Sequence, residues 1–310
     1  MNAAPPDPAH VVIEGITLTN PTRVLYPERG ITKEAMARFY SEIADWVLPH
    51  LVKRPLAIIR CPGGREGQCF FQKHLKGSLP EAVREVELKD GGKGTTCIVI
   101  DSIAGLISLV QMSVLEVHPW GARIDRIETP DRLIFDLDPD SGLPWARVVE
   151  AAVLVRDFLS ELGLESFLKT TGGKGLHVVA PLSGKQGWDD VKAFARGVAR
   201  SIVEAAPRLY IDTASRSARK GKIFIDYLRN GRGATCVAAY STRARAGAPV
   251  STPLGWQELK GDSGRQVAYT IEDLPGRLKR LRKDPWAGFF DLRQSIRKDA
   301  LRRVSAGRRD

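Results

Sequence analysis

Two aspartates that could hold a metal ion, Asp136 and Asp138, end an apolar run that begins at Leu133 and stops at Pro139. Side chains alternate across a β-strand, so both carboxylates are expected on one face, with their Cα atoms about 6–7 Å apart. Two carboxylates this close repel each other unless a cation lies between them, and oxygen ligands suit a hard divalent ion. The spacing therefore predicts a metal site. The same Asp-x-Asp pattern also occurs by chance, in loops, and in glycosyltransferases that hold a nucleotide sugar through a metal.

A third carboxylate, Asp226, lies in a second apolar strand, which is expected over residues 223–227. In that position it would complete the oxygen shell of one or two metal ions, as in two-metal phosphoryl transfer. The alternative is a strand-terminal aspartate whose charge is balanced by a basic neighbour. The three carboxylates together favour a site at which a phosphate group is transferred.

A glycine-rich turn over residues 171–175 could bind phosphate groups. Its glycines allow backbone N–H groups to approach anionic oxygens, and Lys174 and His177 add side-chain donors. The turn is not a P-loop, because it lacks the Gly-Lys-Ser/Thr signature and an expected strand, rather than a helix, follows it. It suits a triphosphate. The alternative is a glycine-rich hairpin with a structural histidine, since strand alternation places His177 on the face of Val179, where it could belong to the core.

The aromatic pair Phe70-Phe71 lies in a polar and basic frame that runs through Gln72, Lys73 and His74. Neighbouring residues of a strand point to opposite faces, so at least one ring should be free unless both faces are buried. A free ring could stack on a nucleobase, which contributes about 1–3 kcal/mol per base. The alternative is that both rings belong to the core.

The charge of the chain favours a polyanionic partner. Its 310 residues include 47 Lys and Arg against 36 Asp and Glu, which gives a net charge of +11 and an isoelectric point near 9.6. A basic excess of this size usually indicates nucleic acid, although a generally basic proteome or a basic tail is an alternative. Basic residues gather over residues 216–245, and again over residues 277–283, where the spacing predicts a surface helix.

The four cysteines, Cys61, Cys69, Cys97 and Cys236, are scattered, with neither a Cys-x-x-Cys pair nor the spacing of a zinc site. They are expected to be reduced, mainly buried thiols in a cytosolic protein. No apolar run approaches the roughly 20 residues that are needed to cross a membrane. Residues 1–10 lack the basic and apolar regions of a signal peptide and are expected to form a flexible leader.

Strands and helices follow one another without a strict βαβ order, which favours a mixed α/β (α+β) fold over a doubly wound parallel sheet. Strands are expected over residues 11–18, 56–60, 97–100, 114–117, 133–137, 223–227 and 235–240, and on both sides of the glycine-rich turn. Helices are expected over residues 33–51, with Thr32 as N-cap, and over residues 103–112, 145–162 and 188–206.

Taken together, these motifs resemble the polymerase domain of bacterial ligase D, a member of the archaeo-eukaryotic primase superfamily that acts in non-homologous end joining. The similarity covers about residues 18–245. Its motifs are, in chain order, Leu18-Thr19-Asn20 with Arg23-Val24-Leu25-Tyr26-Pro27, Phe70-Phe71-Gln72-Lys73-His74, His118-Pro119-Trp120, the acidic strand, the glycine-rich turn that leads to His177, and Ile225-Asp226. The resemblance implies a primase-like fold with central β-sheets flanked by helices, as a single domain over residues 11–310 with a basic C-terminal helical segment.

The resemblance also implies roles for individual residues. The catalytic, metal-binding carboxylates would be Asp136, Asp138 and Asp226. The nucleotide would be bound by His118, Thr171, Lys174, His177, Arg229 and Arg243. Among DNA-binding residues, Asn20, Arg23 and Lys33 would hold a 5′-phosphate, Phe70 and Phe71 would stack on the template, Lys93 would lie in a loop that bridges DNA ends, and Arg219 in a loop that positions the primer. Thr171 departs from the serine expected in the family, and Arg23 stands where lysine is commoner.

The function implied is that of a DNA-repair nucleotidyltransferase, which adds nucleotides, with ribonucleotides preferred, to primer 3′-OH ends and fills gaps. Its cofactor would be a divalent metal, manganese or magnesium. Its partners would be DNA with gaps or broken ends, nucleoside triphosphates, a Ku-type end-binding protein and a ligase domain, in the cytoplasm at the nucleoid and without a membrane. Two alternatives are a non-catalytic module that bridges DNA ends and a true primase. The three carboxylates argue against the first, and the 5′-phosphate residues against the second.

Overall fold

The computed structural model describes residues 10–75, 77–90, 93–215, 217–260 and 266–305. The chain divides into two compact units. Unit 1 comprises Met1–Pro119, Val237–Ser251 and Tyr269–Leu281, and unit 2 comprises Trp120–Cys236, Thr252–Ala268 and Arg282–Asp310. Of the expected leader, residues 1–9 lie outside the described residues, and His10 begins the first strand. The expected single domain stays a prediction, because two compact units can belong to one domain.

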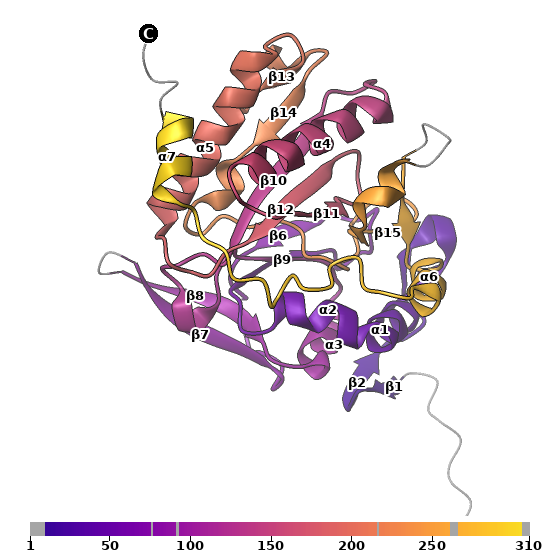
Figure 1. The fold of residues 1–310 in the computed structure, drawn as a ribbon. Helices are drawn as coiled ribbons and strands as arrows, with labels where there is room; N and C mark the ends of the chain where they lie inside the picture. Colours follow the sequence, from indigo (N-terminus) through magenta and orange to yellow (C-terminus); the bar gives the residue numbers. More distant parts are fainter. Residues whose placement is uncertain (1–9, 76, 91–92, 216, 261–265, 306–310) are drawn as a thin grey trace, which may run out of the picture. The chain divides into compact units, whose positions relative to one another are not determined.

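Unit 1 is built around a five-stranded antiparallel sheet in the order β6-β5-β8-β7, with β9 also paired to β5 (Figure 1). The sheet strands are β5 (Leu56–Arg60), β6 (Phe70–Gln72), β7 (Val83–Asp90), β8 (Lys93–Ile100) and β9 (Val114–Pro119). The helices are α1 (Lys33–Glu42), α2 (Ala44–Leu51), α3 (Ile103–Gln111) and α6 (Leu274–Arg280). Short strand pairs join β1 (His10–Ile13) to β2 (Ile16–Thr19), β3 (Val24–Tyr26) to β4 (Ile31–Thr32), and β15 (Pro249–Val250) to β17 (Tyr269–Thr270).

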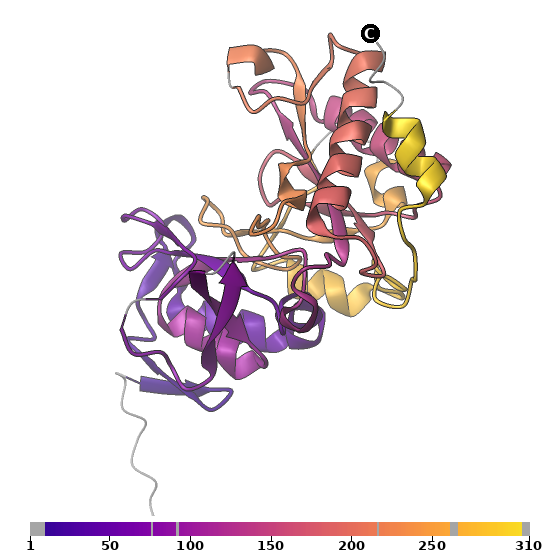
Figure 2. The same cartoon turned by 90° about the vertical axis from the view of Figure 1, so that its left-hand side faces the viewer.

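Unit 2 is built around a six-stranded sheet in the order β13-β14-β10-β12-β11-β16. Its strands are β10 (Arg132–Pro139), β11 (Phe167–Thr170), β12 (Leu176–Pro181), β13 (Tyr210–Ile211), β14 (Ile223–Asp226) and β16 (Pro253–Leu254). The helices α4 (Trp145–Glu161) and α5 (Trp188–Ala205) pack against this sheet. Figure 2 shows α5 in salmon with the short yellow helix α7 (Lys298–Ser305) beside it, in agreement with the contacts between the two.

The alternation that was predicted for the acidic strand is present in β10. Leu133, Phe135 and Leu137 are fully buried and belong to the core of unit 2. On the opposite face, Asp136 is half-buried and Asp138 is exposed. The strand therefore presents its carboxylates away from the apolar face that holds it in place.

Helices and sheets together confirm the predicted mixed α/β fold class. None of the helices in the described parts of the chain is both long and apolar enough to span a membrane.

The expected strand over residues 11–18 is a hairpin of two strands. Glu14 (φ 50°) and Gly15 (φ 77°) adopt left-handed backbone conformations and turn the chain between β1 and β2. Glycine adopts such a conformation without steric cost, so this Glu-Gly pair is the turn signal that the prediction overlooked. The expected strand over residues 235–240 was wrong, because a single β-bridge at Thr235 is the strand pairing found there among the described residues.

The expected helix over residues 33–51 begins where it was predicted. Thr32 Oγ1 accepts a hydrogen bond from the Ala35 N–H at 3.1 Å, which is the N-cap contact. The helix is interrupted at Ile43, whose backbone (φ −104°, ψ 20°) leaves the helical region, and it continues as α2. Since Ile43 is 1% exposed, its apolar side chain belongs to the core at the point where the helix is divided.

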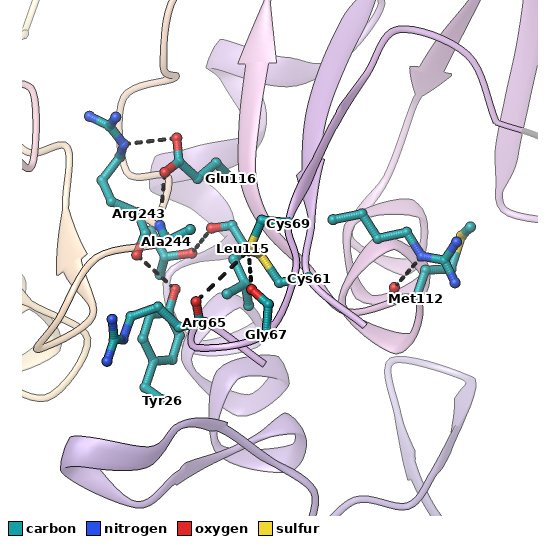
Figure 3. Close-up of a disulfide and its surroundings, with 12 residues drawn as sticks. Tyr26, Cys61, Arg65, Gly67, Cys69, Met112, Leu115, Glu116, Arg243 and Ala244 are labelled. Atoms are coloured by element: carbon teal, nitrogen blue, oxygen red, sulfur yellow. Dashed lines mark hydrogen bonds and ion pairs between the residues drawn. A yellow bond between two sulfur atoms is a disulfide. The ribbon is translucent and has the colours of Figure 1, made fainter. Parts of the chain in front are cut away.

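The structure joins Cys61 and Cys69 by a disulfide, so the expectation that all four cysteines are reduced thiols was wrong. β5 and β6 pair in antiparallel register, with Arg60 opposite Phe70. The next residue on each side is a cysteine, so the register brings the two cysteines opposite each other, with Cα atoms 4.2 Å apart. Figure 3 shows the bond and its surroundings. The pairing follows from strand register, which the spacing of cysteines in the sequence does not reveal.

After exposure to air and unfolding, the protein is expected to show two reactive thiols, those of Cys97 and Cys236, and four after reduction. Thiol titration in denaturant with and without a reductant measures this. In a Cys61→Ser variant, which frees Cys69, we expect three thiols before reduction. A count of four in the unreduced natural chain would show that the bridge does not form, as in a reducing compartment.

Candidate functional site

Four ionisable side chains lie in one row across the sheet of unit 2. The antiparallel register places Asp136 of β10 opposite Asp226 of β14 on one side and opposite His177 of β12 on the other. His177 in turn lies opposite Lys169 of β11. Directly opposite residues of paired strands share a face and have Cβ atoms about 4.5–5.5 Å apart. The row therefore brings together a lysine, a histidine and two carboxylates from four separate segments.

His177 and Asp136 are in direct contact, with 3.2 Å between His177 Nε2 and Asp136 Oδ1. Burial and the Lys169 cation lower the pKa of His177 to about 4, so its ring is neutral at neutral pH. Burial alone would raise the pKa of Asp136, but the His177 ring and the Arg229 guanidinium outweigh it and hold the pKa at about 2. Asp136 is therefore ionised. The 2% exposure of His177 agrees with the alternative that it belongs to the core, and its contact with a nucleotide stays a prediction.

Arg229 lies between the two carboxylates of the row. Its Nη2 is 2.9 Å from Asp226 Oδ2, and its Nε is 3.6 Å from Asp136 Oδ2. Asp226 also accepts a hydrogen bond from the Leu228 N–H at 2.8 Å. Burial and the Asp136 charge raise the pKa of Asp226, and Arg229 opposes this rise. Arg229 was predicted as a nucleotide ligand, and in this structure its charge balances the carboxylates.

Asp138 pairs with another arginine. It lies two residues beyond Asp136 on the same face of β10, and Arg219 Nη1 donates to its Oδ2. The Arg219 guanidinium also lies over the Phe224 ring, 4.3 Å from its centroid, and donates to the Ala214 carbonyl at 3.3 Å. Arg219 was predicted to position a primer strand. Here it supplies the positive charge beside Asp138.

The three carboxylates fit a hard divalent cation by their chemistry. Asp136 and Asp226 are cross-strand neighbours, and Asp138 is on the same strand as Asp136. Their donors are all oxygen, as magnesium and manganese require. Within the residues that the structure describes, no three His, Cys, Asp or Glu side chains converge closely enough to hold a metal ion. Each carboxylate is instead paired with a guanidinium, Asp138 with that of Arg219, and Asp136 and Asp226 with that of Arg229.

The Thr171 hydroxyl organises the glycine-rich turn. Its oxygen accepts hydrogen bonds from the N–H groups of Gly173 (3.2 Å) and Gly175 (3.3 Å), and it donates to the Gly175 carbonyl at 3.1 Å. Gly172 has a φ of 65°, which favours glycine. Lys174, at the tip of the turn, is exposed. Because the hydroxyl makes these bonds, threonine in place of the expected serine preserves the turn, and its contact with a phosphate stays a prediction.

Two further predicted nucleotide ligands, His118 and Arg243, lie in unit 1. His118 Nε2 is 2.8 Å from Glu116 Oε2, and Arg243 Nε donates to the same oxygen at 2.9 Å. The Phe71 ring meets the His118 ring edge to face, with centroids 6.0 Å apart. These four side chains form one cluster, which we call the Glu116 cluster.

Phe70 and Phe71 are 43% and 55% exposed. The prediction that at least one ring lies outside the core is therefore confirmed, and both rings do. They lie on β6, at the edge of the five-stranded sheet. Their stacking on a template base stays a prediction.

Asn20, Arg23 and Lys33 come together at the start of α1. The Arg23 N–H donates to the Asn20 carbonyl at 3.0 Å, and the Lys33 N–H donates to the Arg23 carbonyl at 2.8 Å. Lys33 Nζ donates to the Thr19 carbonyl at 2.8 Å and to Gln111 Oε1 at 3.2 Å. Burial and the Arg23 charge lower the pKa of Lys33. Two cations beside a helix N-terminus are suited to a phosphate group.

Lys93 begins β8 and pairs with Asp90 at the end of the β7–β8 hairpin. It was expected in a loop. The loop residues of that hairpin, 91–92, lie outside the described residues, so the role in bridging DNA ends stays a prediction.

Sequence reasoning missed four residues that the structure places beside predicted ones: Glu116, Gln111, Lys169 and Asn230. Asn230, which is 1% exposed, accepts from the Ile134 N–H at 2.8 Å and donates to the Ile134 carbonyl at 2.7 Å and the Tyr227 carbonyl at 2.8 Å. It thereby ties β10 to the turn that carries Arg229. A lone charged residue inside an apolar strand was the available signal for Glu116 and Lys169.

The structure groups the predicted residues within each unit. Unit 1 holds Asn20, Arg23, Lys33, Phe70, Phe71, Lys93, His118 and Arg243, and unit 2 holds Asp136, Asp138, Thr171, Lys174, His177, Arg219, Asp226 and Arg229. The binding of one nucleotide by residues of both groups stays a prediction.

Comparison with known proteins gives one consistent family. The chain matches the LigD primase-polymerase domain model over residues 32–286. It is 40% identical over 295 residues to the multifunctional non-homologous end joining protein LigD of Pseudomonas aeruginosa, covering 94% of this chain and 35% of that protein. It is 36% identical over 262 residues to the multifunctional non-homologous end joining DNA repair protein LigD of Mycobacterium tuberculosis, covering 82% of this chain and 34% of that protein. The chain thus spans about a third of the length of these curated relatives.

A solved structure, the polymerase domain of Mycobacterium tuberculosis ligase D in complex with DNA, is similar in fold. It matches with a TM-score of 0.82 and 33% identity, and covers 88% of this chain and 97% of that chain. The match confirms the predicted primase-like fold, and the family match confirms the predicted enzyme class, a DNA-directed nucleotidyltransferase. The chain therefore belongs to the LigD primase-polymerase domain family, as its motifs predicted.

Proposed function

We propose that this chain adds nucleotides to the 3′-hydroxyl ends of gapped and broken DNA during repair by non-homologous end joining. The observation that carries the proposal is the register that sets Asp136 opposite Asp226, with Asp138 beside them on β10. Family membership and the net charge of +11 support DNA as the partner. A module that only bridges DNA ends would have no use for clustered carboxylates next to a polyanion.

The three carboxylates would hold the divalent cations on which this family depends, and we propose manganese or magnesium. When bound, such ions neutralise phosphate charge and help to orient the attacking oxygen. The side chains of Arg219 and Arg229 now contact these carboxylates, so both must turn aside when the oxygens become ligands. Either guanidinium would then be available to the phosphates of DNA or nucleotide.

In the proposed reaction, the primer 3′-hydroxyl gives its proton to solvent water and its oxygen forms a bond to the α-phosphorus. The bond from that phosphorus to the bridging oxygen of pyrophosphate breaks, and pyrophosphate leaves. Lys174 and the backbone N–H groups of the glycine-rich turn would bind the triphosphate. His177 would hold Asp136 in place through their 3.2 Å contact. Arg243 would add positive charge around the phosphates, and His118 a hydrogen bond.

A single experiment tests the proposed function: extension of a gapped duplex that carries a 5′-phosphate, with ribo- or deoxynucleotides and with magnesium or manganese. We expect extension that fills the gap, with ribonucleotides and manganese preferred. Chain initiation on single-stranded template without a primer would favour a true primase instead. DNA binding without any nucleotide addition would favour an end-bridging module.

The partners of the complete repair reaction are part of the same proposal. The chain spans about a third of the LigD relatives, so a ligase domain would act either in the same longer protein or separately. A Ku-type end-binding protein would bring it to chromosomal breaks, in the cytoplasm at the nucleoid. Co-purification with Ku on linear DNA but not on circular DNA measures this.

Replacement of Lys33 by alanine is expected to abolish any preference for 5′-phosphorylated gaps over 5′-hydroxyl gaps. A hydrogen bond to a charged group contributes about 1.5–3 kcal/mol, so the ratio of affinities should fall by about 10- to 100-fold. Binding of the two gapped duplexes is measured in parallel. Lys53→Ala, which removes an exposed lysine of the same unit, is the control. An unchanged preference would remove Lys33 from the 5′-phosphate site.

A further inference from the structure

We propose that the buried Glu116 is a positioning residue, which orients the His118 ring and the Arg243 guanidinium toward the phosphate groups of the incoming nucleotide. The inference rests on the proposed function, because it concerns the nucleotide which that function requires. Glu116 was not among the residues predicted from the motifs.

Glu116 is the acceptor that the Glu116 cluster shares. Strand alternation in β9 places it on the same face as His118, and it is 3% exposed. Its Oε2 lies 2.8 Å from His118 Nε2 and accepts from Arg243 Nε at 2.9 Å, while its Oε1 accepts from the Ala244 N–H at 2.8 Å. Both carboxylate oxygens are therefore engaged, and one of them links the His118 ring to the Arg243 guanidinium.

The orientation of Arg243 is fixed from several sides. Its N–H donates to the Pro249 carbonyl, and its own carbonyl accepts from the Tyr26 hydroxyl, both at 2.9 Å. Figure 3 shows the Nε edge of its guanidinium facing Glu116, with the terminal amino groups directed away from that carboxylate. An arginine that is held through Nε directs its two terminal amino groups to the opposite side. A guanidinium binds a phosphate group through two parallel hydrogen bonds.

Glu116 also decides which nitrogen of His118 carries the proton. Burial would raise the pKa of Glu116, but the hydrogen bond from His118 and the charge of Arg243 lower it below its usual value. The group is thus an ionised acceptor, so His118 Nε2 must be the donor. Glu116 thus binds the ring through Nε2, and the proposed contact with a phosphate oxygen is assigned to Nδ1, which donates when the ring is protonated.

The fold of this region has other attachments that do not involve Glu116. The segment around Arg243 is joined to β9 by the Thr242 hydroxyl, which donates to the Leu115 carbonyl at 2.6 Å, and by the Ser241 hydroxyl, which accepts from the Val117 N–H at 3.0 Å. A buried carboxylate loses its hydration, which is destabilising unless polar or charged partners offset the loss. Attachment of the segment is therefore shared by Thr242, Ser241 and Glu116, whereas the link between the His118 ring and the Arg243 guanidinium runs through Glu116.

The test uses a Glu116→Gln variant, which keeps the size of the side chain and removes its charge. Whichever way the amide lies, its NH₂ group faces a donor, either the Ala244 N–H or the Arg243 Nε–H. We expect the KM and the Kd for the nucleoside triphosphate to rise by about tenfold or more, with kcat changed less than about threefold. Affinity for gapped DNA is measured alongside and is expected to change little, while the melting temperature is expected to fall by a few degrees, because the buried amide faces a donor.

Glu28→Gln is the matched control. Glu28 also accepts from a backbone N–H, that of Gly247 at 2.7 Å, and from an arginine, Arg65, but contacts neither His118 nor Arg243. Its nucleotide Kd should equal that of the natural chain. In a chain that already carries His118→Ala and Arg243→Ala, Glu116→Gln should add less than about twofold, because its effect is transmitted through those two side chains.

A measurement on the natural chain makes the proposal independent of how the variant folds. Ring ¹⁵N chemical shifts of His118 are expected to show Nε2 protonated at neutral pH. The role of Glu116 would be overturned by an unprotonated Nε2 or by an unchanged nucleotide Kd in Glu116→Gln. It would also be overturned if Glu116→Gln raised the Kd as much in the chain that lacks His118 and Arg243 as in the natural chain. Failure of the natural chain to extend gapped DNA would overturn the proposed function instead, while equilibrium binding of the triphosphate would still test Glu116.

Discussion

Replacing Asp138 by alanine is expected to lower the rate of nucleotide addition by about 10³-fold or more, because a carboxylate that holds a metal contributes several kcal/mol to stabilising the transition state. The fold should persist, since 53% of the Asp138 side chain is exposed. Its partner Arg219 keeps its contact with the Phe224 ring. Single-turnover extension of a gapped duplex measures the rate, and titration with the same duplex should show nearly unchanged DNA affinity.

Asp140→Ala is the matched control for this experiment. Asp140 lies two residues beyond Asp138, after Pro139, and accepts from the Gly221 N–H at 2.8 Å. The Asp140→Ala substitution removes the same charge from the same end of the strand. Because Asp140 is not among the proposed ligands, the rate of nucleotide addition by this variant should stay within a few-fold of that of the natural chain. Persistent activity in Asp138→Ala would remove that residue from the site. An equal loss in both variants would indicate that negative charge at this strand end matters, rather than ligation by Asp138.

Sequence reasoning could place Asp136 and Asp138 because their relation is local. Alternation within one strand decides that both face away from Leu133, Phe135 and Leu137, and the structure agrees. The position of Asp226 relative to them is different in kind. It depends on which strands pair and in which register, and neither is encoded in a short stretch of sequence. Family resemblance supplied that relation, and the register of β10 with β14 is consistent with it.

Contacts between distant segments were beyond the sequence for the same reason. Glu116 meets Arg243 across 127 residues of chain, because the segment around Arg243 lies beside β9. The disulfide of Cys61 and Cys69 follows from the pairing of β5 with β6. The pairing of Arg219 with Asp138 likewise requires the loop after β13 to return to the end of β10. In each case, the type of a residue could be recognised in the sequence, but the residue that it contacts could not.

The glycine-rich turn offers a prediction of comparable size, at Gly175. A Cβ atom at this position would lie 2.3 Å from the Leu137 carbonyl oxygen, a separation that real Cβ atoms do not adopt. The neighbour is backbone, so it cannot move aside as a flexible side chain would. Gly175→Ala must therefore displace either the turn or β10, at a cost of about 1–3 kcal/mol in stability.

Gly175→Ala is expected to lower the rate of nucleotide addition strongly, while its loss of stability is moderate. Leu137 lies between Asp136 and Asp138, so a shift of its carbonyl displaces both carboxylates, and a misplacement of about 1 Å can lower the rate by about 10²-fold. Gly121→Ala is the control, because a Cβ there would meet its nearest neighbour, the Arg132 carbonyl oxygen, at an ordinary 3.6 Å. Extension rate and melting temperature are compared for both variants. If Gly175→Ala melts at a lower temperature yet adds nucleotides at the natural rate, the turn adjusts without moving the carboxylates. A loss of rate with little loss of stability would instead show that the close approach of turn and strand sets the positions of the proposed metal ligands.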